Sequence, residues 1–312
     1  MSSHTQIRKV RFIVNPISGA TRNTERIIEL VNKIWEGSEI EYEVRKTAHR
    51  GNATELAREA VVRQTDMVVA VGGDGTINEV GRGLIGSDVI LGVIPTGSGN
   101  GFARNFNIPL KIRKSIELLK RPGVKRIDVG KINDHYFFNV AGIGLDAEIC
   151  AHFERFGFRG PLPYFMIGIR EFFRYRPQPV MLHLNGHTDL HFHPIVLSIA
   201  NGPQYGNGAI IAPHAKPDDG VLDFCVLSSI SILKALVNTQ KLFNGNIDQL
   251  SEMKIYQSAT GTIQREKEGY IHTDGDHHLE RGELKIEVLP AQLNLAVSYT
   301  DDTSLEVDNP QI

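Results

Sequence analysis

The pattern of apolar and polar residues divides the chain into two parts. Predicted strands and helices alternate in the first part, and predicted strands predominate in the second. In the first part, short apolar or alternating runs rich in β-branched residues are typical of strands. These predicted strands lie at residues 9–14, 41–47, 68–72 and 89–94. Apolar residues spaced three or four apart predict helices at residues 24–35, 52–64 and 111–120. This alternating order predicts a doubly wound α/β domain, in which helices cover a parallel sheet with right-handed crossovers.

The second part begins near Asp128, where strands take over from helices. Predicted strands follow at residues 136–141, 179–184, 194–200, 221–227 and 270–273. The pair Asn185-Gly186, between two alternating runs, is a strong hairpin-turn sequence. The second part is therefore predicted to be an antiparallel β-sandwich, so the whole fold combines an α/β domain with an all-β domain.

Composition and charge narrow the class of protein. The chain has 312 residues, and its net charge of −2 does not favour nucleic acid as a partner. Its two cysteines, Cys150 and Cys225, lie far apart in sequence, which indicates a reducing compartment. No apolar run approaches the roughly 18 residues that span a bilayer, and the first residues lack the apolar core of a signal peptide. We therefore expect a cytoplasmic protein that meets any membrane from outside.

The strand at residues 68–72 ends in Gly-Gly-Asp-Gly-Thr at residues 72–76, and a helical pattern follows. The glycines allow a tight turn and a close approach to a ligand, and N–H groups at a helix start form an anion site. Thr76 is predicted to cap the helix, with Glu79 completing a capping box. Asp74 suits the Mg²⁺ that accompanies a nucleotide. The alternative is a strand-to-helix corner with no ligand.

A second glycine-rich corner follows the next predicted strand. It reads Pro-Thr-Gly-Ser-Gly-Asn-Gly-Phe-Ala-Arg at residues 95–104. Consecutive parallel strands end at the same edge of a sheet, and doubly wound folds bind their ligands at that edge. The two corners are therefore expected to lie together.

These two corners closely resemble the catalytic domain of diacylglycerol kinases and of their sphingosine and ceramide kinase relatives, above all the soluble bacterial lipid kinases. The sequence Asn-Pro-x-Ser-Gly at residues 15–19 also belongs to the resemblance, which covers nearly the whole chain. Gly-Gly-Asp-Gly alone is less specific, because NAD kinases and phosphofructokinases carry similar loops. The resemblance implies a nucleotide-binding domain at residues 1–127, a substrate domain at 128–289, and a C-terminal segment, 290–312, that returns to the first domain. It also places the active site in the cleft between the domains.

The resemblance implies that ATP and Mg²⁺ bind at the sheet edge. No Gly-Lys-Ser/Thr of the Walker type is present, so the main chain of the glycine corners must bind the phosphates. The implied nucleotide-binding residues are Asn15, Ser18, Thr47, Gly72, Gly73, Asp74, Gly75, Thr76, Asn78, Thr96, Gly97, Gly99 and Asn100.

The resemblance also assigns residues to metal ions. Asp74 and Asp128 would hold the active-site Mg²⁺ through waters, although Asp128 read alone is equally a surface residue between elements. A second, structural Mg²⁺ would take Asp219 together with carbonyl oxygens near Lys216 and Val221. The alternative for this stretch is an Asp-Asp-Gly turn without metal.

Four further residues are assigned to the acceptor. Asp274 is the candidate base for the substrate hydroxyl, and Asp276 stands where the family typically has Glu, so its role is open. Asp146 would meet a lipid headgroup, and Arg104 is assigned to substrate binding. On sequence alone, Asp274-Gly275 is a hairpin turn and Asp146 is a turn or cap residue.

The sequence therefore predicts an ATP- and Mg²⁺-dependent lipid kinase that acts at a membrane surface, without nucleic acid, and the resemblance allows a homodimer. Aromatic residues interleaved with arginines at 153–177 suit a lipid surface, or a helix packed on the sandwich. Two alternatives stay open for the activity. They are an NAD kinase-like enzyme with a soluble acceptor, and a lipid- or nucleotide-binding protein without activity.

Overall fold

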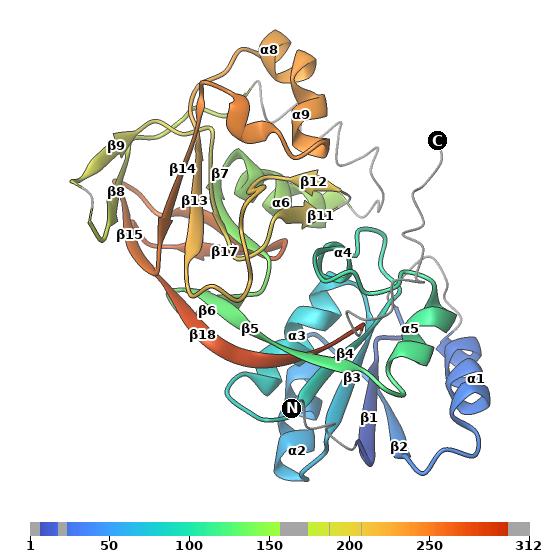
Figure 1. Cartoon of the computed structure of the whole chain (residues 1–312). Coiled ribbons are helices and arrows are strands. Elements are labelled where there is room, and N and C mark those ends of the chain that lie inside the picture. Colours follow the sequence, from blue (N-terminus) through green and yellow to red (C-terminus); the bar gives the residue numbers. More distant parts are fainter. Residues whose placement is uncertain (1–6, 18–23, 157–173, 187, 207, 299–312) are drawn as a thin grey trace.

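The computed structural model describes residues 7–17, 24–156, 174–186, 188–206 and 208–298. An α/β part and a β-sandwich adjoin each other (Figure 1). The helices of the described residues are α1 (Thr24–Trp35), α2 (Asn52–Val62), α3 (Asp74–Leu84), α4 (Gly101–Asn105), α5 (Ile112–Leu118), α6 (Leu145–Phe156), α8 (Ile232–Val237), α9 (Thr239–Phe243) and the 3-10 helix η1 (Ile247–Gln249). None of them is long and apolar enough to cross a bilayer.

The strands fall into two large sheets and one short ribbon. They are β1 (Lys9–Val14), β2 (Glu41–Lys46), β3 (Met67–Gly72), β4 (Ile90–Pro95), β5 (Gly123–Ile132), β6 (His135–Phe137), β7 (Val140–Gly144), β8 (Val180–Leu184), β9 (Leu190–Phe192), β10 (Val196–Ala200), β11 (Gln204–Gly206), β12 (Ala209–Ile210), β13 (Leu222–Leu227), β14 (Met253–Ser258), β15 (Thr260–Arg265), β16 (Gly269–Thr273), β17 (Asp276–Glu280) and β18 (Glu283–Val297).

In the α/β part, the parallel strands run in the order β2-β1-β3-β4. Both faces of this sheet are covered, which explains the unbroken apolar run in β3. Val68 and Ala70 pack in the core that includes residues of α2 and α3. Val69 and Val71 pack in the core that includes residues of α1 and α5. Helices therefore lie on both faces of the sheet, as the sequence predicts.

Strand β18 joins the two parts (Figure 1). Its first residues pair antiparallel with β15, it pairs antiparallel with β5 along most of its length, and Asn294 and Leu295 pair parallel with β4. The register shifts between Leu289 and Leu293, where Ala291 has a positive φ of 52°. The parallel sheet therefore continues, through β18, into one layer of the sandwich.

The other layer of the sandwich is antiparallel, in the order β14-β13-β10-β7-β16-β17. The core between the layers contains Leu182, Ile263 and Ile286 from the first layer and Ile143, Leu197 and Phe224 from the second. Alternating apolar positions thus face inward from both sheets. The predicted fold class, an α/β domain with a β-sandwich, is confirmed.

One strand prediction is wrong in an informative way. Residues 136–141 form two strands, β6 and β7, that belong to different sheets, with a break at Phe138 and Asn139. The N–H groups of these two residues donate to the carboxylate of Asp274 instead of to a neighbouring strand. The apolar pattern is continuous across the break, so it could not reveal it.

Candidate active site

The two glycine corners lie in direct contact. Strands β3 and β4 are neighbours, and the Thr96 N–H donates to the Gly72 carbonyl (2.8 Å). A Cβ added to Gly97 would lie 2.7 Å from the Cα of Gly73, closer than any side chain allows. A Cβ on Gly75 would meet no atom of the described residues within 4 Å. The main chains of the two corners are thus in direct contact, and Gly75 faces a space that no described residue fills.

Asp74 connects the two corners. Its carboxylate accepts the N–H groups of Gly101 (3.1 Å) and Phe102 (3.0 Å), at the start of α4. Asn100, just before α4, has a positive φ of 50° and donates to the Gly97 carbonyl (2.9 Å). The Oδ1 atom of Asn100 is buried and has no hydrogen-bond partner among the described residues. Asp74 therefore fixes the second corner against the first.

The Thr76 cap is not formed. Helix α3 begins at Asp74, with Gly73 as the N-cap and no side-chain cap. The Thr76 hydroxyl instead accepts a hydrogen bond from Asn15 Nδ2 (3.0 Å), and Glu79 accepts the N–H of Ala53 on α2 (3.2 Å). The prediction failed because the chain enters helical geometry three residues earlier than the capping pattern suggests.

Other residues assigned to the nucleotide gather at the same sheet edge. The Asn15 N–H donates to the Val71 carbonyl (3.1 Å), and the Thr47 N–H donates to the Val14 carbonyl (2.9 Å). Asn15 and Thr47 thus follow the ends of β1 and β2, beside the first corner. Ser18 lies outside the described residues, and so does most of the segment 153–177.

Asp274 lies in a hairpin turn and holds the two parts of the molecule together. The turn Asp274-Gly275 connects β16 to β17, and both residues have positive φ, 49° and 93°. The Asp274 carboxylate accepts the N–H groups of Phe138 (2.8 Å), Asn139 (2.9 Å) and Val140 (3.1 Å). The hairpin-turn interpretation therefore describes the backbone, while the carboxylate binds the main chain of residues 138–140.

The fourth donor to Asp274 comes from the α/β part. Asn78, on the helix that starts at the first glycine corner, donates its Nδ2 to Asp274 Oδ2 (2.7 Å). Burial raises the pKa of Asp274 above its usual range and outweighs the opposite effect of the four hydrogen bonds. The candidate base is thus both fixed in place and more basic than an exposed aspartate.

Asp276 lies further out on the same hairpin. Its carboxylate pairs with Arg50 Nη2 (3.4 Å), from the loop before α2, and its side chain is 39% exposed. Arg50 therefore makes a second contact between the α/β part and the hairpin. The role of Asp276 in the reaction stays a prediction.

Asp128 lies in the middle of β5 and is buried, so it is not the surface residue of the simpler interpretation. Its carboxylate accepts the N–H groups of Gly220 (2.7 Å) and Ala291 (2.7 Å). It thus holds both the loop before β13 and the irregular point of β18. Asp74 and Asp128 bind different backbone segments, and no hydrogen bond joins them in the described part of the chain.

The loop assigned to a structural Mg²⁺ is held in place by hydrogen bonds to Asp128. The Asp128 N–H donates to the Pro217 carbonyl (2.7 Å), and Asp219 Oδ1 accepts the Val221 N–H (3.2 Å). Asp219 and Lys216 are exposed. The described residues contain no cluster of three His, Cys, Asp or Glu side chains that could bind a metal, so an ion here would depend mainly on carbonyl oxygens.

Asp146 belongs to a buried polar network that sequence inspection missed. Its Oδ2 accepts the Tyr205 hydroxyl (2.7 Å) and lies 3.0 Å from His272 Nε2, while Ser198 hydrogen-bonds to Tyr205. His272 is 2% exposed, and its Nδ1 has no hydrogen-bond partner within the described part of the chain. The one available signal was the position of His272 two residues before Asp274 on an alternating strand.

Arg104 and Asp146 are therefore not equivalent as candidates for substrate binding. The exposed Arg104 donates its Nε to the Gly99 carbonyl (3.2 Å), beside the second corner. Asp146 is 8% exposed. Its carboxylate accepts hydrogen bonds from the Ala147 N–H and the Tyr205 hydroxyl, and a third from His272 when Nε2 of that ring carries the proton. Both assignments stay predictions.

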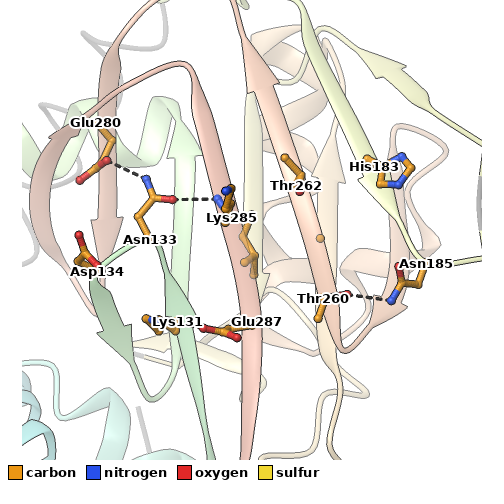
Figure 2. Close-up of a pocket in the computed structure, with 12 residues that line it drawn as sticks. Lys131, Asn133, Asp134, His183, Asn185, Thr260, Thr262, Glu280, Lys285 and Glu287 are labelled. Carbon is orange, nitrogen blue, oxygen red and sulfur yellow. Dashed lines mark hydrogen bonds and ion pairs between the residues drawn. The ribbon is translucent and has the colours of Figure 1, made fainter.

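A separate cavity of about 620 Å³ lies over the strands β5, β8, β15 and β18, away from the glycine corners (Figure 2). Six of its polar residues form three pairs within the cavity. Lys131 contacts Glu287 (3.0 Å), Asn133 donates to Glu280 (2.8 Å), and Asn185 donates to Thr260 (2.9 Å). We assign this cavity no part in the chemistry.

Two family models match the chain in succession. Residues 9–132 match the diacylglycerol kinase catalytic domain, and residues 139–297 match the YegS C-terminal NAD kinase beta sandwich-like domain. The first match covers the α/β part through β5, and the second covers the sandwich and β18.

Sequence relatives carry consistent names. The chain is 30% identical over 280 residues to a diacylglycerol kinase of Mycobacterium tuberculosis, covering 87% of this chain and 89% of the relative. It is 32% identical over 232 residues to a diacylglycerol kinase of Bacillus subtilis, covering 72% and 76%. It is 32% identical over 211 residues to a probable YegS-like lipid kinase of Yersinia pestis, covering 65% and 70%.

The fold has a close counterpart among solved structures. A putative diacylglycerol kinase from Bacillus anthracis superposes with a TM-score of 0.77 at 25% identity, covering 94% of this chain and 98% of that one. Family models, relatives and fold agree along nearly the whole described chain. The chain belongs to the family of diacylglycerol kinases and YegS-like lipid kinases.

Proposed function

We propose that the chain transfers the γ-phosphoryl group of ATP to the hydroxyl of a lipid such as diacylglycerol or a sphingoid base. The observation that carries the proposal is the hydrogen bond between Asn78 and Asp274. It fixes the candidate base against the helix that starts at the first glycine corner. A hydroxyl beside Asp274 and a phosphate at the corner would therefore be held in one orientation, which phosphoryl transfer requires.

Main-chain groups of the glycine corners would bind the phosphates. Gly75 leaves room for a ligand close to the backbone, and N–H groups at the start of α3 favour an anion. The unpartnered Oδ1 of Asn100 needs a donor, because a buried acceptor without one costs free energy. A water on Mg²⁺ or a nucleotide hydroxyl would supply that donor.

Bound Mg²⁺ would neutralise charge on the transferring phosphoryl group. We assign Asp74 and Asp128 to hold it through waters. An ionised carboxylate offers about four acceptor positions, and backbone N–H groups occupy two on each of these residues. Asp219 and the carbonyls of Lys216 and Val221 would hold a second ion with the oxygen ligands that Mg²⁺ prefers.

On the acceptor side, Asp274 would accept the proton of the lipid hydroxyl. The hydroxyl oxygen forms the new bond to phosphorus while the bond from phosphorus to the leaving ADP oxygen breaks, and the proton moves to the Asp274 carboxylate. The raised pKa of Asp274 supports this role, because a stronger base takes the proton more readily. Asp276 and Arg50 would support the hairpin that carries it.

The test is transfer of labelled γ-phosphate from ATP·Mg²⁺ to a panel of lipids in mixed micelles, with NAD as a soluble acceptor. We expect labelled lipid phosphate and no labelled NADP. Label on NAD alone would instead assign the chain to soluble kinases. ATP binding without transfer to any acceptor would favour a binding protein and contradict the proposal.

A further inference from the structure

Helices α8 and α9, between β13 and β14, expose four large apolar side chains, while Leu242 of α9 packs against the core. Leu233 and Val237 are each 71% exposed, Leu236 is 52% exposed, and Phe243 on α9 is 50% exposed. Neither helix has a buried residue. Nine large apolar side chains are exposed in the described part of the chain, and four of them lie within residues 233–243. The exposed apolar surface is thus concentrated on this helix pair.

The arrangement on α8 is the reverse of an ordinary surface helix. Leu233, Leu236 and Val237 are spaced three and four residues apart, so they share one helix face. In a globular protein such a stripe normally packs on the core. Here it faces away from the sandwich, which indicates a surface that is covered by something else.

Charge on the helix pair favours an anionic partner. From residue 224 to residue 247 the chain has no Asp or Glu, while Lys234 and Lys241 contribute positive charge. Lys234 pairs with Glu252 at the edge of the helix pair, so Lys241 carries the charge argument and the apolar side chains would supply most of the affinity for a partner. Apolar residues with flanking lysines and no acids are the composition of helices that lie in a membrane interface.

The helix pair is connected to the glycine corners by a short path. A Cβ on Gly208, just before β12, would lie 4.0 Å from the ring of Phe243. Strand β12 pairs with β11, and a Cβ on Gly101, at the start of α4, would lie 3.0 Å from the Cα of Gly206. Figure 1 shows α9, the β11–β12 ribbon and α4 in this succession.

We propose that the surface formed by Leu233, Leu236, Val237 and Phe243 docks on an anionic lipid bilayer. The inference rests on the proposed function, since an acceptor lipid resides in a bilayer that the enzyme must reach. Docking through α8 and α9 brings the ribbon and the second glycine corner toward the bilayer. The apolar side chains enter the interface, and Lys241 lies among the anionic headgroups.

The test compares two variants of the full chain. The triple variant Leu233→Gln, Val237→Gln, Phe243→Gln removes the apolar surface while keeping good helix formers. The matched control, Val62→Gln, changes another exposed apolar residue, 82% exposed on α2 in the α/β part. Binding is measured by sedimentation with vesicles of phosphatidylcholine and phosphatidylglycerol. Transfer is measured on long-chain diacylglycerol in these vesicles and on a water-soluble short-chain diacylglycerol.

We expect the triple variant to bind vesicles at least about tenfold more weakly, while Val62→Gln binds like the wild type. Transfer to vesicle diacylglycerol should fall and transfer to short-chain diacylglycerol should not. Lost vesicle binding with no lipid phosphorylated by the wild type would support the surface and overturn only the kinase proposal. Equal vesicle binding by all three proteins would overturn the surface. Light scattering could instead show that the wild type is a dimer and the triple variant a monomer. If vesicle binding were then unchanged, that result would also overturn the surface.

Discussion

The donor side of the candidate site, at residues 72–76 and 95–101, is built differently from its acceptor side, the hairpin that carries Asp274 and His278. Apart from the carboxylate of Asp74, the donor side consists of main chain packed against main chain, as at Gly73 and Gly97. The acceptor side includes two ionisable side chains whose pKa values burial shifts, upward for Asp274 and downward for His278. Backbone groups bind charge without titrating, so the pH dependence of the enzyme should come mainly from the acceptor side.

The largest effect on ATP binding is expected from a substitution that separates the two glycine corners of the donor side. Gly97→Ala places a methyl group 2.7 Å from the Cα of Gly73, so the corners must separate. We expect ATP to bind at least about tenfold more weakly and the free energy of unfolding to fall by about 1–3 kcal/mol. Isothermal titration and urea unfolding measure the two quantities.

Gly75→Ala is the matched control, because its methyl group meets no atom within 4 Å in the described ranges of the chain. Alanine favours a helix interior, so the free energy of unfolding should stay the same or rise by up to about 1 kcal/mol. ATP binding should still weaken, since the methyl group occupies the open space assigned to phosphate. Wild-type ATP affinity in both variants would show that the corners do not bind nucleotide.

The hydrogen bond from Asn78 to Asp274, which connects the two sides, should influence the pH dependence of transfer. The base must be ionised, so the rate falls as the pH drops through the raised pKa of Asp274. Asn78 lowers that pKa through its hydrogen bond, so Asn78→Ala should move the acid limb to higher pH. It should also reduce the free energy of unfolding by about 1–3 kcal/mol.

Asn133→Ala provides the comparison, since Asn133 donates to Glu280 (2.8 Å) away from Asp274. It should destabilise the protein without moving the acid limb. A profile of kcat/KM against pH for the three proteins separates the two effects. An acid limb that Asn78→Ala leaves unmoved would mean that another group controls it.

The smallest effect concerns stability at mildly acidic pH. Burial, helped by the stacked ring of His135 3.8 Å away, lowers the pKa of His278 from 6.5 to about 4. Below pH 6.5 the unfolded chain therefore binds a proton that the folded chain does not, and stability decreases as the pH falls towards 4. His278→Gln should flatten this part of the stability curve measured by urea unfolding.

The sequence predicts the donor side better than the acceptor side because glycine corners are local. The strands before residues 72 and 95 are visible as apolar runs, and neighbouring parallel strands end at one edge. Even so, the capping role of Asp74 toward Gly101 and Phe102 was not visible, because it depends on how the two corners meet.

The acceptor side is assembled from positions that are distant in sequence. Asn78 and Asp274 are 196 positions apart, and no local pattern connects them. The network of Asp146, Tyr205 and His272 likewise joins a helix to strands of two sheets. Its members look like an ordinary turn residue, a residue of a glycine-rich tract and a strand residue until the sandwich brings them together.

The central claim is that Asp274 acts on the acceptor while the glycine corners bind the donor. The direct measurement is ATP·Mg²⁺ binding and single-turnover transfer to lipid in Asp274→Asn, with folding checked by urea unfolding. We predict unchanged ATP binding and transfer reduced by about 10²–10⁴-fold in a folded protein. Wild-type transfer by this variant would contradict the assignment of Asp274 as the base.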